Sequence, residues 1–385
     1  MGTPPLTSRL PTVGTTIFTV MSQLALEYRA VNTGQGFPDF EPPLELRERV
    51  AYHLGARHNQ YAPMAGVVAL REAIAAKVAR HYGRTASPGS EITVTSGGTE
   101  ALASSIQALV HPGDEVVLFD PAYDSYQPIV ELVGGRPLRV PLARPRFDID
   151  WDRLAGAIGA RTRLVIVNTP HNPSGACLGA ADLDRLAELL RPTGAFVIAD
   201  EVYEHMVFDG QRHASLNGHA ELAERSIVVS SFGKTYHATG WKVGYTVAPP
   251  ALTEEVRKVH QFVTFATASV LQYAIADFMV AHPEWEDEVP AFYQQKRDRL
   301  VTLLAGSRLG LEPAHATYFQ LVDYSAISDK PDTEFALELI RGHGVVTIPV
   351  SPFCASPPAE ERLVRLCFAK EDATLRAAAE RLLKL

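Results

Sequence analysis

The chain has 385 residues, of which 46% are hydrophobic and 21% charged, a composition typical of a globular protein with room for two domains. The formal net charge of -8 argues against a nucleic-acid-binding surface, and three scattered cysteines are too few for a disulfide framework or a Cys-rich metal site. The polar, proline-rich start lacks a signal-peptide core, and no run of residues is long and apolar enough to span a bilayer. We therefore expect a cytoplasmic protein without a membrane or nucleic-acid partner.

The first half of the chain predicts an α/β domain. Residues 1–46 are rich in Pro and Gly and are predicted to be irregular, whereas 70–83 predicts an amphipathic helix that ends at Gly83. Short β-branched runs then alternate with helical ones, at 91–96, 114–120, 163–170, 195–200 and 226–232. These runs lack polar alternation, as expected of strands that are buried on both faces of a parallel sheet.

The remainder of the chain predicts a smaller α+β domain. From about residue 253 a helical pattern leads into 290–306, and strand patterns at 318–323 and 362–369 then mix with helices. We expect the N-terminal segment to join this domain. The predicted division is an N-terminal arm with part of the small domain at 1–45, a large domain at 46–280 and a small C-terminal domain at 281–385.

Polar residues follow the predicted strands at the positions where one site would need them. In an open α/β sheet, ligands bind in the crevice beyond the carboxyl ends of the strands. The residues at these positions are Gly97, Gly98, Thr99, Tyr123, His171, Asn172, Asp200, Glu201, Tyr203 and the segment 231–242. We therefore expect a single cofactor site at this edge of the sheet.

The segment TSGGTEAL places Gly97, Gly98 and Thr99 between a strand and a helix. A helix N-terminus presents unpaired N–H groups and the positive end of a dipole, which suits a phosphate, and glycine permits close approach. A tight strand–helix turn would explain the same residues. The pattern is neither GxGxxG nor GxxxxGK[ST], which argues against dinucleotide and P-loop sites.

Asp200 ends an apolar strand, where a carboxylate needs a partner. A heterocyclic N–H⁺ would suit, because an opposite charge within hydrogen-bond distance favours both ionised forms. Asp200 could instead cap the next helix. Because no carboxylate-rich or His-rich set supplies further ligands, we expect no metal.

Lys234 lies in SSFGKTYHATGWKVGY, directly after a buried strand. A lysine in a semi-buried site has a readily lowered pKa, which suits Schiff-base chemistry, and Ser231 and Lys242 are suitable phosphate ligands. A single loop lysine is usually a surface residue. The hypothesis that Lys234 is functional therefore depends on its neighbours.

With Asn172, Asp200, Tyr203 and Lys234 after successive strands, the chain resembles the fold-type-I aminotransferases, which use pyridoxal 5′-phosphate. The resemblance runs from about residue 15 to the C-terminus and is especially close to the methionine aminotransferase and kynurenine/glutamine transaminase branch. The stretches that carry it are NTGQGFPDF, NQYAPMAGVVALREAIA, FDPAYDSY, NTPHNPSG, ADEVYEHM, SSFGKTYHATGWKVGY and VRLCFAKEDATL. It implies the fold-type-I architecture, a large domain with a mostly parallel seven-stranded sheet between helices plus a smaller α+β domain.

The resemblance also implies roles for the residues that would hold the cofactor ring. Lys234 would form the internal aldimine and later move the proton between Cα and C4′. Asp200 would pair with the pyridinium nitrogen, and Tyr123 would stack on the ring. Asn172 and Tyr203 would hydrogen-bond the ring O3′.

The phosphate would be held by the Gly98 and Thr99 backbone, Ser231 and Lys242, with Tyr61 reaching the phosphate of the partner in a homodimer. Many relatives carry Arg at the position of Lys242, so its phosphate contact is expected to be single rather than forked. The common NPTG motif is NPSG here.

The substrate side of the site is implied in the same way. Arg365 would grip the substrate carboxylate as a fork, which Lys could not reproduce, with Gly36 and Asn172 nearby. Phe18, Tyr61 and Tyr123 would form an aromatic entrance, although Phe18 could equally pack the N-terminal arm. No second arginine for a side-chain carboxylate stands out.

The predicted activity is ping-pong transfer of an amino group from methionine or an aromatic amino acid to a 2-oxo acid. A cysteine-S-conjugate β-lyase on the same fold is the alternative, and it would use the same Lys234, Asp200 and Arg365. A non-catalytic cofactor-sensing regulator would need an appended basic DNA-binding module, which the sequence lacks. An NAD dehydrogenase would need the missing glycine fingerprint.

Overall fold

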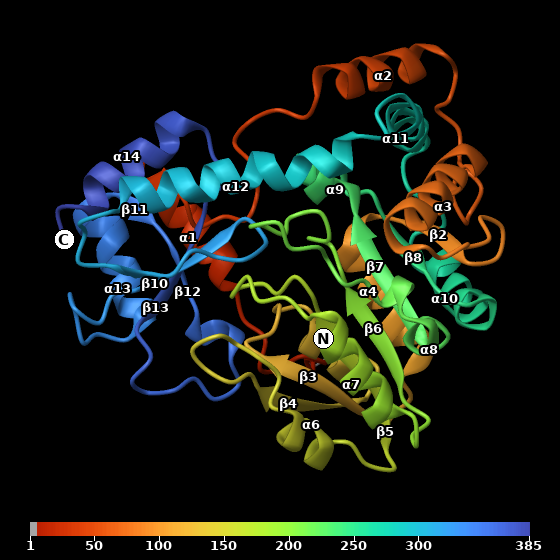
Figure 1. The fold of residues 1–385 in the computed structure, drawn as a ribbon, viewed down its shortest axis with the longest axis horizontal. Coiled ribbons are helices and arrows are strands. Elements are labelled where there is room, and N and C mark those ends of the chain that lie inside the picture. The colour runs from red at the N-terminus through yellow and green to blue at the C-terminus, as the bar shows by residue number, and fades with distance from the viewer. Residues whose placement is uncertain (1–5) are drawn as a thin grey trace, which may run out of the picture.

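The computed structural model describes residues 6–385, and a seven-stranded sheet lies at the centre of its larger part (Figure 1). The strand order is β2-β8-β7-β6-β5-β3-β4. Their bounds are β2 Ile92–Thr95, β3 Glu115–Asp120, β4 Arg136–Pro141, β5 Thr162–Asn168, β6 Phe196–Asp200, β7 Ser226–Ser231 and β8 Gly244–Val247. Neighbouring strands are parallel except at β8, which runs antiparallel to both β2 and β7. The predicted mostly parallel seven-stranded sheet is confirmed, but β2 has only an antiparallel partner.

Both faces of this sheet are buried, as the apolar strands predict. On β3, Val116 and Leu118 belong to one core cluster, whereas Val117 and Phe119 belong to another. Successive side chains of a strand point to opposite faces, so continuous apolar strands require helices on both sides. Because β3, β5, β6 and β7 run parallel to one another, their carboxyl ends lie at the same edge of the sheet.

Helices precede, connect and follow the strands of this sheet. Those before and within the large sheet are α2 Leu44–Gly55, α3 Val68–Tyr82, α4 Gly97–Leu109, α5 Tyr126–Leu132, α6 Trp151–Ala157, α7 Ala180–Leu190, α8 Ala220–Ala223 and α9 Phe232–Thr235. Those after it are α10 Pro250–Val263, α11 Ser269–Ala281, α12 Trp285–Leu303, α13 Asp332–Glu338 and α14 Asp372–Leu382. As predicted, α3 ends before Gly83, whose φ of 70° is left-handed. Within residues 6–385, none of these helices is long and apolar enough to cross a membrane.

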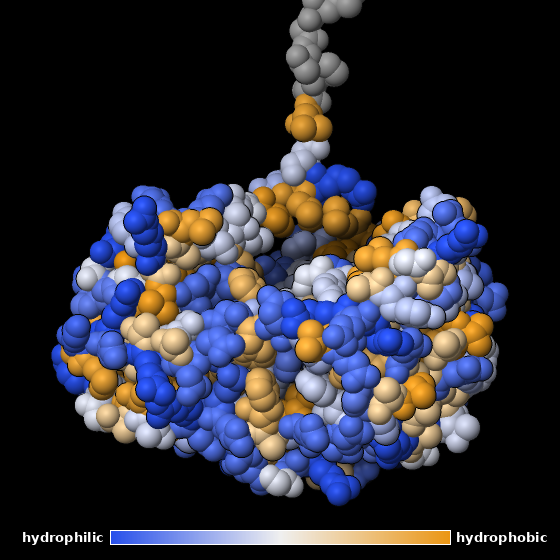
Figure 2. All heavy atoms as spheres, turned by 90° about the horizontal axis from the view of Figure 1, so that it is seen from above, coloured by the Kyte–Doolittle hydropathy of each residue, from blue (hydrophilic) through white to orange (hydrophobic). Residues whose placement is uncertain are grey.

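A second, smaller sheet follows in the chain. Its order is β12-β13-β10-β9, with antiparallel neighbours. The strands are β9 Gly310–Leu311, β10 Phe319–Asp323, β12 Ile348–Pro349 and β13 Leu363–Cys367. The long helix α12 runs from beside α9 towards α14 and this sheet (Figure 1). Seen from above, the surface is hollowed between two lobes (Figure 2). The domain boundaries at residues 45 and 280 stay a prediction.

The prediction that residues 1–46 are irregular is confirmed at 34–43, which form no helix or strand, but it was wrong at 17–27 and 31–32; residues 1–5 lie outside the described part. Helix α1 spans Ile17–Glu27 and begins at Thr16, whose side chain accepts a hydrogen bond from the Thr19 N–H. Its Met21 packs in a core cluster with C-terminal residues such as Phe353. Strand β1 (Val31–Asn32) then pairs in parallel with β11 (Val345–Val346). This long-range packing stabilises the N-terminal arm, and the local Pro and Gly content gave no sign of it.

Candidate active site

A cavity of about 140 Å³ opens at the carboxyl ends of the central strands. It brings together the predicted site residues Gly98, Thr99, Tyr123, Asn172, Asp200, Tyr203, Ser231, Lys234 and Lys242. The lining also includes Gly97, Leu102, Asn168, Val202 and Thr239. Residues from five different segments of the chain therefore converge on one cavity.

Lys234 lies on α9, a single helical turn that directly follows β7, rather than in an open loop. Its Nζ donates to the Tyr318 hydroxyl at 2.7 Å and to the Gly36 carbonyl at 3.4 Å, and the Tyr318 hydroxyl donates to the same carbonyl at 2.5 Å. Burial lowers the pKa of Lys234 to about 8, and the charges of Lys242 and Arg365 act in the same direction. At neutral pH a useful fraction of this amine is therefore uncharged and nucleophilic.

Asp200 ends β6 and is buried. The Tyr126 hydroxyl donates to Asp200 Oδ2 at 2.5 Å, and the Val202 N–H lies 3.4 Å from Oδ1. Burial raises the pKa of Asp200 to about 6, and the hydrogen bond from Tyr126 opposes that rise. A cation bound beside this carboxylate would relieve the cost of its burial.

The N-terminus of α4 forms a small cradle. Its N-cap residue, Ser96, makes no side-chain capping bond to the helix. Gly97 has a φ of +79°, and a Cβ there would lie 3.2 Å from Lys242 Cε. Lys242 Nζ is 3.5 Å from Thr99 Oγ1, and Ser231 lines the same cavity. Free helix N–H groups, a lysine and hydroxyl groups are the donors that a phosphate requires.

Arg365 occupies β13, between β12 and β10, and is 1% exposed. Its Nη1 donates to Asn172 Oδ1 at 2.7 Å and its Nη2 to the Gly34 carbonyl at 3.1 Å, whereas Nε is buried without a partner. The guanidinium lies 3.8 Å from the centre of the Phe319 ring and 5.4 Å from that of Phe18. A buried cation with an unpartnered N–H is suited to bind a carboxylate.

Tyr61 is the one predicted site residue that lies apart from this cluster. Its side chain is 87% exposed and packs edge-on against Phe265, with the ring centres 5.6 Å apart. Gly36, by contrast, is brought to the site through its carbonyl, and a Cβ at Gly36 would lie only 2.8 Å from the Phe319 ring.

Three residues of the site were missed by sequence reasoning. They are Tyr126, which contacts Asp200, Tyr318, which contacts Lys234, and Asn168, which lines the cavity. Asn168 ends β5, so its position at a strand end was a usable signal. Tyr126 and Tyr318 gave no comparable signal, because each meets its partner across a long stretch of chain.

The chain is similar to known proteins over nearly its whole length. A family model described as "Aminotransferase class I and II" matches residues 29–382. A methionine aminotransferase of Escherichia coli is 54% identical over 98% of both chains, and human kynurenine–oxoglutarate transaminase 1 is 33% identical over 94% of both. The solved structure of an E. coli protein with a methionine aminotransferase function has a TM-score of 0.96 at 54% identity, covering 99% of this chain and 100% of that one. That of an N-succinyldiaminopimelate aminotransferase of Mycobacterium tuberculosis has a TM-score of 0.95 at 39% identity, with the same coverage.

Proposed function

Since the chain belongs to the class I and II aminotransferase family and is a transaminase that uses pyridoxal 5′-phosphate, we propose that it takes amino groups from methionine and aromatic amino acids. The observation that carries this proposal is the surroundings of Arg365. Its guanidinium has a buried Nε–H without a partner, which suits a carboxylate, and aromatic rings pack around it. A substrate whose carboxylate binds there would find aromatic rings close at hand.

The residues of the cavity fit the cofactor. The α4 cradle, Ser231 and Lys242 would hold its phosphate, and the buried Asp200 would hold its ring N–H⁺. Lys234 Nζ would hold its aldehyde carbon. When bound, pyridoxal 5′-phosphate supplies an electron sink for the electrons released at the substrate α-carbon.

The remaining work falls to side chains of this chain. Lys234 Nζ would take the proton from the substrate α-carbon, which its lowered pKa of about 8 permits near neutrality. Tyr318 and the Gly36 carbonyl fix the position of that amine. Tyr126 keeps Asp200 ionised, and Arg365 orients the carboxylate. The second half of the reaction would use the same groups in reverse, so we expect ping-pong kinetics.

The preference for uncharged side chains is supported by the charges of the site. Within the described residues, the cavity lining contains two lysines, Lys234 and Lys242, and the proposal assigns both to the cofactor. Burial raises the pKa of the Asp124 carboxyl, and Arg365 opposes that rise, so an acidic group lies in the electrostatic range of the fork. A second carboxylate, as in aspartate, would lack a cation and meet a like charge.

A homodimer is the assembly that the surface favours. Tyr61 and Phe262 are 87% and 86% exposed, and Val263 and Phe265 are also exposed on the neighbouring segment. Exposed apolar side chains that gather in this way mark interaction sites. In the proposed dimer, Tyr61 would reach the cofactor phosphate of the partner. Tyr61→Ala should therefore weaken cofactor binding, although its side chain lies outside the cavity of its own chain; unchanged binding would contradict the shared site.

A comparison of amino donors tests the proposed function. Holoenzyme is mixed with methionine, phenylalanine or aspartate without an acceptor, and the 2-oxo acid formed in the first turnover is measured. We expect methionine and phenylalanine to react at least tenfold faster than aspartate. If aspartate reacts as fast as methionine, the proposed preference is wrong. If no donor gives a product, the assigned active site is wrong.

The same material separates the β-lyase alternative. A cysteine S-conjugate is incubated with holoenzyme in the absence of an oxo acid. The transaminase proposal expects the reaction to stop after about one turnover per site, whereas continued release of pyruvate would identify a lyase.

A further inference from the structure

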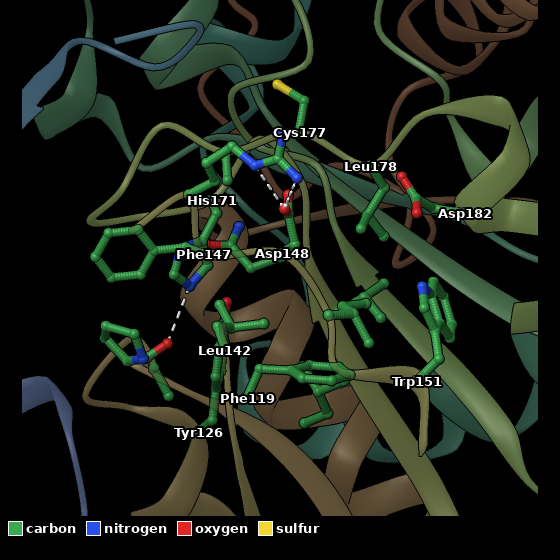
Figure 3. Close-up of a pocket in the computed structure, with 18 residues that line it drawn as sticks. Phe119, Tyr126, Leu142, Phe147, Asp148, Trp151, His171, Cys177, Leu178 and Asp182 are labelled. Atoms are coloured by element: carbon green, nitrogen blue, oxygen red, sulfur yellow. Dashed lines mark hydrogen bonds and ion pairs between the residues drawn. The ribbon is translucent and has the colours of Figure 1, made fainter. Parts of the chain in front are cut away.

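A second and larger cavity, of about 390 Å³, lies on the α6–α7 side of the sheet (Figure 3). Its walls come from the ends of β3 and β5, the loop between β4 and α6, and the loop that leads into α7. Among residues 6–385, Asn168 is the one residue that lines both this cavity and the proposed cofactor site. The two cavities therefore lie back to back at the same edge of the sheet. Its volume is within the range of small-molecule sites.

The cavity leaves part of the hydrophobic core unfilled. Four core side chains line it and keep some exposure: Phe119 7%, Leu142 8%, Phe147 7% and Ile149 9%. A deeper member of the same cluster, Val165, is 0% exposed. Protein interiors are normally close-packed, and apolar side chains that face a void lose dispersion contacts. An apolar occupant would restore those contacts.

Three polar side chains of the wall, His171, Asn168 and Tyr126, already have hydrogen-bond partners and therefore offer little to a bound water. His171 Nδ1 is 2.6 Å from Ser174 Oγ, and Nε2 is 2.9 Å from the Pro121 carbonyl. The Asn168 amide donates to the Asp200 carbonyl and accepts a hydrogen bond from the Asn172 N–H. A buried water needs two to four polar partners, as a rough rule. The wall therefore favours a ligand that asks for few hydrogen bonds.

The charges of the wall favour an uncharged ligand. Arg146 and Asp148 form an ion pair at 2.8 Å, and Asp182 accepts the Gly179 N–H at the N-terminus of α7. Burial lowers the pKa of His171 to about 4, so this ring is neutral at pH 7. Burial raises the pKa of Cys177 to about 12, so this residue is a thiol.

We propose that this cavity binds a small uncharged aromatic molecule, distinct from the amino-acid substrate, and that its occupant acts on the proposed cofactor site through Tyr126 and Asn168. The aromatic walls, which include Phe119, Phe147 and Trp151, favour a flat ring. Tyr126 also lines the cavity, and its hydroxyl holds Asp200. A ligand that packs against the Tyr126 ring therefore contacts the side chain that hydrogen-bonds the Asp200 carboxylate. By linkage, any effect on cofactor affinity is matched by the effect of cofactor on the ligand.

Protection of Cys177 tests the binding without any substitution. Holoenzyme is treated with N-ethylmaleimide across a series of indole concentrations, and modification of each cysteine is followed by peptide mass spectrometry. Cys354 is the internal control, because it is also a half-buried free thiol with a raised pKa but lies outside the cavity wall. We expect indole to slow modification of Cys177 at least tenfold, with saturation, and to leave Cys354 within twofold. No protection of Cys177 at the solubility limit of indole, or equal slowing of both thiols, would overturn the proposal.

A cavity-filling variant tests the coupling. Ala176 lines the wall and is half-buried, so Ala176→Phe should place a ring in the cavity and weaken indole protection of Cys177 at least tenfold. In the native holoenzyme, saturating indole should change the half-time of pyridoxal 5′-phosphate release during dialysis at least threefold, and in Ala176→Phe it should not. Unchanged release in the native enzyme would overturn the coupling, and that measurement stands even if the variant does not fold.

Discussion

Replacement of Tyr126 by Phe removes one hydroxyl and tests how the carboxylate of Asp200 is kept ionised. The hydroxyl donates to Asp200 Oδ2 at 2.5 Å, and the remaining contact, from the Val202 N–H, is long at 3.4 Å. Hydrogen bonds to charged groups contribute about 1.5–3 kcal/mol. Since one pKa unit corresponds to about 1.4 kcal/mol, loss of this bond should raise the pKa of Asp200 by roughly one to two units.

The sign of the pH effect follows from the starting value. The pKa of Asp200 is raised to about 6, so roughly nine-tenths of this carboxyl is ionised at pH 7. In Tyr126→Phe we expect roughly a tenth to a half to be ionised at pH 7. Because the ionised form would hold the cofactor ring, the variant should bind cofactor weakly at pH 7 and recover as the pH rises above the new pKa.

The assay measures the dissociation constant of pyridoxal 5′-phosphate and the apoenzyme between pH 5 and 9. This range covers the expected rise of about one to two units in the pKa of Asp200. The control is Tyr82→Phe, which removes a buried hydroxyl that donates to Glu204, away from the cavity. Glu204 keeps Lys77 at 2.5 Å and Tyr245 at 3.3 Å, so the control should lose some stability but retain the wild-type pH profile. Superimposable profiles for Tyr126→Phe and wild type would refute the reasoning.

Three further substitutions probe separate parts of the structure. Asp200→Asn should raise the melting temperature of the apoprotein above pH 6 and weaken cofactor binding at least tenfold. Burial raises the pKa of Asp200 to about 6, so the charge of this carboxylate costs stability above that pH. A lower melting temperature would contradict this reasoning. Arg365→Lys should lower kcat/KM for methionine about 100-fold, or about 2.7 kcal/mol, and leave cofactor binding unchanged. Lysine cannot form the two parallel hydrogen bonds that a guanidinium makes to a carboxylate. A change below threefold would argue against this role of Arg365. Lys77→Met should lower the free energy of unfolding, measured in urea, by about 3–5 kcal/mol, because it leaves the buried Glu204 carboxylate without its cation. The double variant Lys77→Met/Glu204→Gln should recover part of the lost free energy. No recovery would argue that the loss does not come from the unpaired charge.

The large sheet and the core of the site could be predicted because their signals are local. Each strand is a short apolar run that ends near a polar residue, so Asp200 and Lys234 could be identified from their positions at or just after strand ends. Parallel strands bring such ends to one edge, which is why these two residues share a cavity.

The rest of the site depends on contacts between distant segments. Tyr126 and Asp200 lie 74 residues apart, and Arg365 and Asn172 lie 193 apart. Helix α1 (Ile17–Glu27) is stabilised by packing against C-terminal residues, so its flanking Pro and Gly residues were misleading. The second cavity arises where loops cover the sheet edge, and no motif marks it.

The lysine to which the cofactor is attached can be identified by chemical reduction. Within the described residues, two lysines, Lys234 and Lys242, line the proposed cofactor cavity, and burial lowers the pKa of Lys234 to about 8. Borohydride reduction of the holoenzyme locks the cofactor onto the lysine that holds it, and peptide mass spectrometry then locates the added mass. We expect a pyridoxyl group on Lys234; a group on Lys242 or any other lysine would contradict the role assigned to Lys234.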